Sequence, residues 1–176
     1  DEIYGNYFGV GSTKVYLENM CKFYSQLGKT KFTVIRQTNI YGPNDEFDTD
    51  NGHFFAATVD KVINADKDIV VWGDGTEEKD LLYVKDLINF IQLVIDNQDS
   101  TFELVNLSSG KSFTVKDIVK TIMSVFDKDL EIKYDLTKPS RKYGLKVNSD
   151  KAKSLFGWES EYDLQKGISE IKEIGV

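Results

Sequence analysis

The chain has 176 residues, of which 40% are hydrophobic and 12% aromatic, and its formal net charge is −7. This length and composition predict one compact globular unit and exclude a disordered or low-complexity segment. The negative charge disfavours polyanions, so nucleic acid is not an expected partner. No apolar stretch approaches the roughly 20 residues of a bilayer span, so no membrane partner is expected. The single cysteine, Cys21, cannot form an internal disulfide, which favours a reducing, cytoplasmic location.

The amino-terminal part of the chain alternates between helical and extended patterns. Over residues 14–27 apolar side chains recur at helical spacing, and Gly28 supplies a stop. Residues 32–35 are β-branched or apolar, as is typical of a strand buried on both faces of a parallel sheet. Residues 39–52 carry turn-forming and acidic side chains, which predict a loop.

The rest of the chain continues this alternation. Helices are expected at 53–65, 86–97, 114–126, 149–156 and 164–174, and strands at 69–72, 81–84, 102–107 and 130–134. Thr114 and Asp117 resemble a capping box at a helix start. The pattern predicts an α/β fold, the C-terminal part of a Rossmann-like parallel sheet plus a smaller mixed α/β substrate-binding lobe. We expect the Rossmann portion at 1–45 and the lobe at 46–176, with segments returning to the sheet.

The glycine-rich turn that binds a dinucleotide is missing from the sequence. There is no G-x-G-x-x-G after a strand, so no helix start is prepared to hold a pyrophosphate. The chain also opens on a loop and a helix, ahead of the buried strand at 32–35. We therefore expect that the N-terminal part of the Rossmann domain is absent from this chain.

Three motifs in a fixed order resemble the extended short-chain dehydrogenase/reductases, the NAD-dependent epimerase/dehydratase family. A helix containing Lys14 is followed by Arg36-x-x-Asn39-x-Tyr41-Gly42-Pro43 and then by Trp72-Gly73-x-Gly75. Residues 39–47, N-I-Y-G-P-N-D-E-F, are followed six residues later by His53, which resembles the GDP-L-fucose synthase branch most. Further agreements lie at 71–76, 138–139 and 156–158, so the resemblance covers nearly the whole chain.

The resemblance implies an epimerase/reductase that acts on a nucleotide-linked, GDP-type 4-keto-deoxy sugar with NADP or NAD. Inverting a carbon beside a carbonyl requires a base on one face and an acid on the other. His53 matches the family's acid, and its ordinary pKa near 6.5 suits that role. Lys14 matches the catalytic lysine that also contacts the cofactor ribose, and Thr38 falls at the cofactor. The family's cysteine partner would lie upstream, and Cys21 is on the wrong helix position to replace it.

The chain departs from the family at the tyrosine that donates a proton to the carbonyl oxygen. Four residues before Lys14 stands Val10, which cannot donate a proton. Tyr7 is the alternative donor, because nearby glycines allow a non-helical path that brings its hydroxyl toward Lys14. If residues 7–14 were helical, Tyr7 would instead lie about 10 Å along the axis from Lys14.

The resemblance also implies a substrate site. Lys61, Lys79 and Lys138 fall where the family places basic contacts to the diphosphate or sugar, and Trp72 falls where it lines the nucleotide site. Lysine in place of arginine at the first two positions offers point charges rather than bidentate forks. Each lysine has a simpler alternative as a solvated surface charge, and Trp72 has one as a core residue.

Several readings stay open at this point. Asn39 contacts the sugar or holds the loop, and Arg36 has a structural role. We expect Lys14, Asn39 and His53 to converge on one cleft, the helix at 14–27 to form a homodimer, and no metal to be bound. Two alternatives to the epimerase/reductase remain: an epimerase that has lost the reductive step, as Val10 suggests, and a nucleotide-sugar-binding subunit without catalysis.

Overall fold

The computed structural model describes residues 5–49, 52–138 and 146–175. In chain order these residues form the short 3-10 turn η1 (Gly5–Tyr7) and the helices α1 (Phe8–Ser25), α2 (Phe54–Asn64), α3 (Val84–Asn97), α4 (Val115–Val125), α5 (Asp150–Phe156) and α6 (Leu164–Ile174). The strands are β1 (Phe32–Gln37), β2 (Asn39–Tyr41), β3 (Asp68–Trp72), β4 (Glu78–Tyr83), β5 (Phe102–Leu107), β6 (Ser112–Thr114) and β7 (Glu131–Asp135). The predicted α/β class is confirmed.

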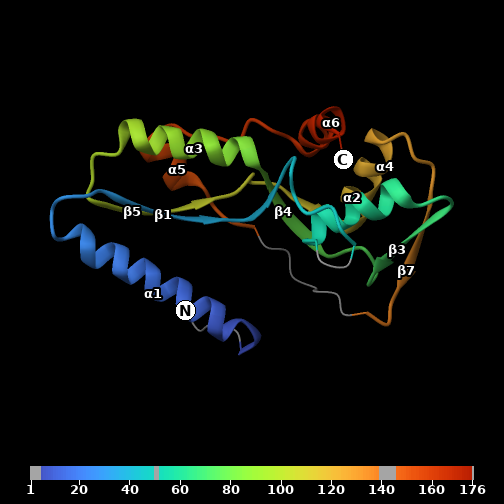
Figure 1. Ribbon diagram of the computed structural model, residues 1–176, viewed down its shortest axis with the longest axis horizontal. Helices are drawn as coiled ribbons and strands as arrows, with labels where there is room; N and C mark the ends of the chain where they lie inside the picture. Colours follow the sequence, from blue (N-terminus) through green and yellow to red (C-terminus); the bar gives the residue numbers. More distant parts are fainter. Residues whose placement is uncertain (1–4, 50–51, 139–145, 176) are drawn as a thin grey trace.

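One part of the molecule, which we call the sheet region, is built on the parallel pair β1 and β5. Helix α1 lies on one face of this pair, and α3 with α5 lies on the other (Figure 1). Its buried core includes Leu82, Phe90, Leu107 and Trp158. Helices on both faces of a parallel pair are the layering of a doubly wound Rossmann-like sheet.

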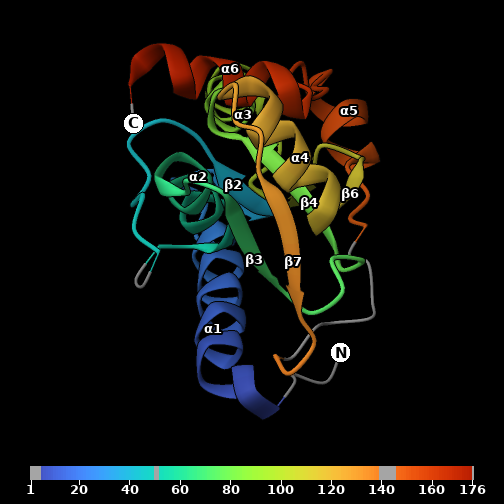
Figure 2. The same ribbon diagram turned by 90° about the vertical axis from the view of Figure 1, so that its right-hand side faces the viewer.

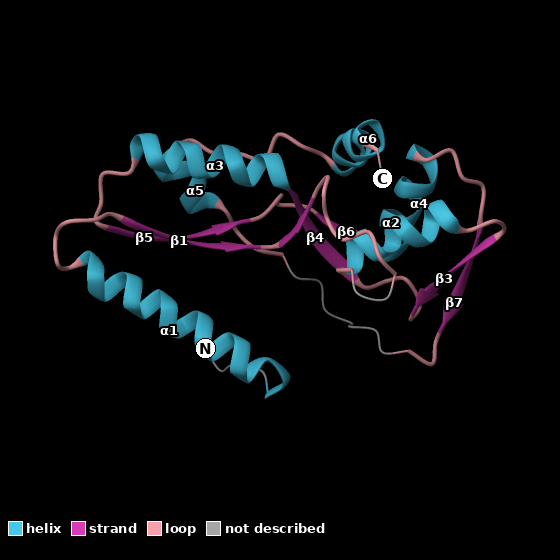
Figure 3. Ribbon diagram, in the orientation of Figure 1, coloured by secondary structure: helices cyan, strands magenta, loops and turns pink. Residues whose placement is uncertain are grey.

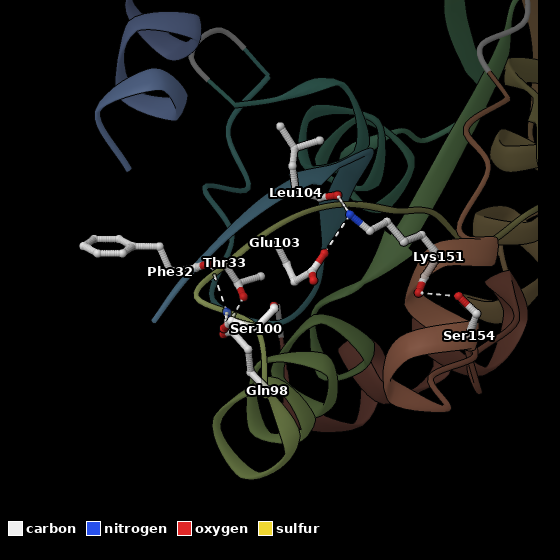
Figure 4. Close-up of polar contacts among 8 residues, drawn as sticks. All are labelled: Phe32, Thr33, Gln98, Ser100, Glu103, Leu104, Lys151 and Ser154. Carbon is white, nitrogen blue, oxygen red and sulfur yellow. Dashed lines mark hydrogen bonds and ion pairs between the residues drawn. The ribbon is translucent and has the colours of Figure 1, made fainter. Parts of the chain in front are cut away.

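Polar side chains fasten the outer end of this strand pair (Figure 4). The Gln98 amide nitrogen donates to the Phe32 carbonyl at 3.0 Å, while the Thr33 hydroxyl donates to the Gln98 amide oxygen at 2.7 Å. On the α5 side the Lys151 ammonium pairs with the Glu103 carboxylate at 2.7 Å. The end of α3 and the start of α5 are thus tied to the strands that they cover.

The second part, which we call the lobe, is built on the parallel pair β3 and β7. These strands lie side by side, and α2, α4 and α6 pack behind them (Figure 2). Val59, Ile118, Ile122 and Ile168 are fully buried in the shared core. Thr114 is the N-cap residue of α4, and its hydroxyl accepts from the Asp117 backbone N–H at 3.1 Å, as the capping pattern predicted.

Strand β4 leads from the lobe into the sheet region, and it lies between β2 and β6 (Figure 3). It pairs in parallel with β2 and antiparallel with β6. We expected residues 39–41 to belong to a loop, and this was wrong because β2 is stabilised by its pairing with β4, where Asn39 faces Leu81. Strand β6 was not expected for the same reason.

Two further expectations about the sheet region need correction. The first helix begins at Phe8 rather than Lys14, since residues 8–13 continue the same helix without a break. Residues 32–35 are half-buried rather than buried on both faces, because β5 is the one described strand that pairs with β1.

None of the described helices has the length and apolar character that crossing a bilayer requires.

Candidate functional site

A cavity of about 390 Å³ lies where β1 passes into β2 and where α2 begins. Thr38, Asn39 and His53 line it together, with Phe54 and Leu81 as apolar walls. This is the carboxyl end of the strand β1, the edge at which open α/β sheets bind their ligands. Three of the predicted site residues therefore meet at one place, although His53 lies 14 residues after Asn39 in the sequence.

The buried Asp80 is hydrogen-bonded to two of the residues that line this cavity. It is fully buried and accepts hydrogen bonds from the hydroxyls of Thr38, Ser108 and Ser109, at 3.2 Å for Thr38 and 3.0 Å for Ser109. The Asn39 side-chain amide donates to the Asp80 backbone carbonyl at 3.1 Å. Asp80 thus holds together the ends of β1 and β5 and the start of β2, which fixes the cavity wall.

His53 is the N-cap residue of α2 and is exposed at the cavity. Its backbone is extended, with φ −63° and ψ 160°, and its side chain makes no capping hydrogen bond. The His53 backbone carbonyl accepts from the Ala57 N–H at 2.9 Å, so the helix anchors the main chain of this residue. The imidazole is consequently placed on a fixed backbone beside a cavity, as a proton donor for a bound ligand must be.

Lys14, Val10 and Tyr7 lie at α1 and do not line this cavity. Lys14 is exposed on the helix, and Val10 is 60% exposed. The non-helical path that we expected for Tyr7 is wrong, because the chain is helical from Phe8 onward. Seven residues of helix separate Tyr7 from Lys14 by about 10 Å along the axis. The structure therefore supplies no route by which Lys14 activates the Tyr7 hydroxyl.

A second cavity, also of about 390 Å³, adjoins the first because Phe54 lines both. Its lining includes Lys61 from α2, Trp72 from β3, Glu77 and Lys79. These residues come from three separate elements of the lobe. Three of the predicted substrate residues, Lys61, Trp72 and Lys79, therefore line one cavity beside His53.

Trp72 forms an exposed aromatic surface next to two cations. Its side chain is 57% exposed, with the Lys61 ammonium 5.5 Å and the Lys138 ammonium 5.2 Å from the ring centre. Lys138 reaches it because β3 and β7 run in parallel and Trp72 pairs with Asp135 at the strand ends. A flat ring flanked by positive charges suits a planar base attached to phosphates. The alternative role of Trp72 as a core residue is excluded by its exposure.

Lys79 is held by two neighbours. Its ammonium lies 2.6 Å from a carboxylate oxygen of Glu77 and 5.0 Å from the centre of the Phe54 ring. The lysine is therefore held beside Phe54, the residue that lines both cavities. Among the described residues, no group of three or more histidine, cysteine or acidic side chains is arranged to hold a metal ion.

Arg36 and Tyr41, which belong to the recognised motif, stabilise the fold. Arg36 forms a two-point ion pair with Glu18 of α1, at 2.7 Å and 2.5 Å, which lowers the pKa of Glu18. Tyr41 is 2% exposed and packs against Phe55, with 4.5 Å between ring centres. These contacts agree with the structural role expected for Arg36.

Asp80, Phe54 and Glu77 were not singled out by sequence reasoning. Asp80 follows the charged residues 77–79 and precedes the apolar end of β4, so its sequence position resembles an exposed charge. Its full burial, which is unusual for a carboxylate unless it is well bonded, is visible only in the structure. Phe54 and Glu77 carry no sequence signal either, because their importance comes from cavities formed by separate elements.

The fold defines a Rossmann-like α/β protein whose lobe presents an exposed aromatic ring and lysine side chains at a cavity. The chain belongs to the NAD dependent epimerase/dehydratase family, whose pattern matches residues 9–108.

Named relatives and solved structures agree with this assignment. A putative GDP-L-fucose synthase 2 from Arabidopsis thaliana is 35% identical over 77% of this chain and 42% of its own length. The structure of a UDP-glucose 4-epimerase with UDP-glucose from Thermotoga maritima is similar, with a TM-score of 0.74 and 28% identity, over 92% of this chain and 50% of that one. A GDP-L-fucose synthetase from Naegleria fowleri bound to NADP has a TM-score of 0.82 at 21% identity, over 90% of this chain and 52% of that one, and shows the fold alone. This chain spans about half the length of the curated relatives that it matches.

Proposed function

We propose that this chain forms the substrate-binding part of a nucleotide-sugar epimerase/reductase that acts on a GDP-linked 4-keto-deoxy sugar. The observation that carries the proposal is the pair of adjoining cavities. One presents Trp72 between two lysines, as a nucleotide requires, and the other presents His53, as proton transfer requires. Phe54 is shared by both, so one extended ligand reaches from the aromatic surface to the imidazole.

In this proposal each residue has a defined task. Trp72 stacks on the base, and Lys61, Lys79 and Lys138 neutralise the diphosphate. His53 donates a proton to the carbon beside the sugar carbonyl after a base has removed one from the opposite face. Asn39 keeps the cavity wall in place through its hydrogen bond to Asp80, rather than contacting the sugar by the same amide hydrogen.

The reductive step needs NADP or NAD, which supplies a hydride when it is bound. Lys14 fits a contact with the cofactor ribose because its ammonium is exposed on α1. Thr38 does not offer its hydroxyl hydrogen to a cofactor, since that hydroxyl donates to Asp80 at 3.2 Å. The described residues thus supply one cation for the cofactor, and the pyrophosphate needs backbone N–H groups at a glycine-rich turn, which the sequence lacks.

A second candidate function is epimerisation without net reduction. The similarity to a UDP-glucose 4-epimerase supports it, and so does Val10, which carries no hydroxyl for protonating the sugar oxygen. A nucleotide-sugar-binding subunit without catalysis is the third reading.

We further propose a cytoplasmic homodimer that associates through α1. This helix exposes several large apolar side chains, among them Phe8, Val10, Tyr16 and Leu17, each at least 55% exposed. Apolar surface of this extent on one helix fits an interaction site. We also retain the division into a Rossmann portion at 1–45 and a substrate lobe at 46–176.

The experiment that tests the function separates proton exchange from hydride transfer. The full-length protein is incubated with a GDP-linked 4-keto-deoxy sugar in deuterated water, with and without NADPH. Deuterium uptake beside the carbonyl measures epimerisation, and NADPH oxidation measures reduction. We expect both, and we expect His53→Asn to lower the uptake by roughly 10²–10⁴-fold.

Gln92→Ala, on the exposed side of α3, is the matched control and should leave both rates unchanged. Uptake without NADPH oxidation would favour the epimerase that has lost reduction. Binding without either reaction would favour the non-catalytic subunit. Uptake that is unaffected by His53→Asn would remove His53 from the mechanism.

A further inference from the structure

The cavity beside Trp72 contains a carboxylate, which a site for an anion does not require. Among the described residues that line this cavity, Glu77 is the one acidic side chain, and it stands beside Lys61 and Lys79. A negative charge at this place opposes the binding of phosphate groups. We therefore infer that this carboxylate affects the strength or the selectivity with which the site binds its ligand.

Glu77 and Lys79 form a partly buried ion pair. The Glu77 carboxylate and the Lys79 ammonium are 2.6 Å apart, and their side chains are 18% and 23% exposed. The Phe54 ring covers the ammonium, with 5.0 Å from its centre to the nitrogen. Because water is partly excluded, each of these charges acts on a ligand more strongly than a charge in bulk solvent would.

Among the described residues, the charges at this cavity include three lysines and two carboxylates. Lys61, Lys79 and Glu77 line the cavity, whereas Lys138 lies over the Trp72 ring and interacts with Asp135. Glu77 therefore offsets one positive charge at the cavity itself. A nucleotide sugar carries one negative charge on each of its two bridging phosphates. An uncapped nucleoside diphosphate carries nearly one charge more, because its terminal phosphate is close to doubly ionised at neutral pH. The gain from that extra charge grows with the positive potential of the site.

We propose that Glu77 is a specificity-determining residue that lowers the positive potential of this cavity and so shifts its preference from uncapped nucleoside diphosphates toward sugar-capped ones. The inference rests on the proposed function, since it assumes that the diphosphate binds beside Trp72. Glu77 acts by its charge, and it also keeps the Lys79 ammonium beside the Phe54 ring. An enzyme with this residue discriminates against the free nucleotides that compete with its substrate.

The test is the ratio of two affinities in the full-length protein. Calorimetry at low ionic strength measures the binding of GDP and of GDP-fucose to the unsubstituted protein and to Glu77→Gln. Glutamine keeps an oxygen that accepts a hydrogen bond from Lys79 but removes the charge. We expect GDP affinity to rise about fivefold more than GDP-fucose affinity, as one extra ligand charge in a partly screened site predicts. The Glu77 backbone carbonyl, which accepts from the Val115 N–H at 2.8 Å, is unaffected by the substitution.

Two further variants separate this role from a structural one. Glu78→Gln removes a charge at the exposed neighbouring position, which faces the other way on an extended strand, so the ratio should stay unchanged. Glu77→Asp keeps the carboxylate and should keep the ratio within about twofold of the original. An unchanged ratio in Glu77→Gln, or an equal shift in Glu78→Gln, would overturn the proposal for Glu77 alone. If the unsubstituted protein bound neither ligand, the proposed function itself would fall.

Discussion

The lobe and the sheet region differ in how much apolar surface they bury within the described residues. The lobe gathers sixteen buried side chains into one cluster, whereas the cluster of the sheet region has seven. Within α1 the buried residue is Ser25, while Phe8, Tyr16 and Leu17 are at least 55% exposed. The apolar residues of the lobe therefore face one another, and those of α1 largely face outward.

This difference shows which region buries its apolar side chains against other parts of the same chain. Helices α2, α4 and α6 enclose a common core with β3 and β7, so the cavity beside Trp72 has rigid walls made by this chain. Helix α1 carries Lys14 and contacts the sheet region on one side. Its exposed apolar side chains fit the proposal that another protein surface covers it.

The largest expected effect is a contrast between core substitutions in the two regions. Ile122→Ala empties a fully buried position of α4, so it should lower the free energy of unfolding by about 2–5 kcal/mol. Leu17→Ala on α1, where the side chain is 55% exposed, should change it by less than about 0.5 kcal/mol. Urea unfolding of dilute full-length protein measures both. Equal losses would show that α1 is buried in the same way as the lobe.

A second contrast uses one glycine from each region. A Cβ added at Gly167 of α6 would lie 2.8 Å from the Tyr41 ring, which is held by Phe55 and Tyr83 and cannot move away. Gly167→Ala should therefore cost about 1–3 kcal/mol.

The matched control for Gly167→Ala is Gly9→Ala in α1. A Cβ at Gly9 meets nothing within 4 Å, and alanine is the better helix former, so stability should stay equal or rise by up to about 1 kcal/mol. Thermal unfolding distinguishes the two variants. A tolerated Gly167→Ala would mean that α6 shifts freely on the lobe core.

Sequence reasoning succeeded where one segment contains its own signal. The amphipathic helices, the capping of α4 by Thr114 and the strand at 102–107 were all readable from local patterns. Strands β2 and β6 were missed because each has three residues and is stabilised by pairing with β4, which no local pattern records.

The candidate site divides in the same way. His53, Trp72 and the lysines were named from motif order, whereas Glu77 and Phe54 matter because separate elements place them at a shared cavity. The expected path of Tyr7 toward Lys14 failed for a physical reason. The glycines of this segment permit a non-helical course, but they do not prevent the helix that forms from Phe8.

The smallest expected effect appears only in acid and concerns the joint between the two regions. Glu170 of α6 accepts hydrogen bonds from Lys85 of α3 and from the hydroxyls of Tyr83 and Tyr162, both at 2.8 Å. Lys85, followed by the two tyrosines, lowers the pKa of Glu170 from 4.5 to about 2. Because the folded state binds this proton less readily than the unfolded state, the contribution of Glu170 is complete above pH 4.5 and is lost as the pH falls toward 2.

Glu170→Gln should therefore flatten the decline of stability with pH between 4.5 and 2, relative to the unsubstituted protein. Glu173→Gln, at an exposed position of the same helix, should leave that decline unchanged. Chemical unfolding at a series of pH values, followed both by a probe in the lobe and by a probe in the sheet region, makes the measurement. Glu170 connects α6 to α3, so its protonation should weaken the coupling of the two regions. In acid the two probes should therefore report different denaturant midpoints, although both regions are still folded without denaturant. Coincident transitions throughout this pH range would show that the buried contacts along β4, and not the polar contacts of Glu170, make the two regions unfold together.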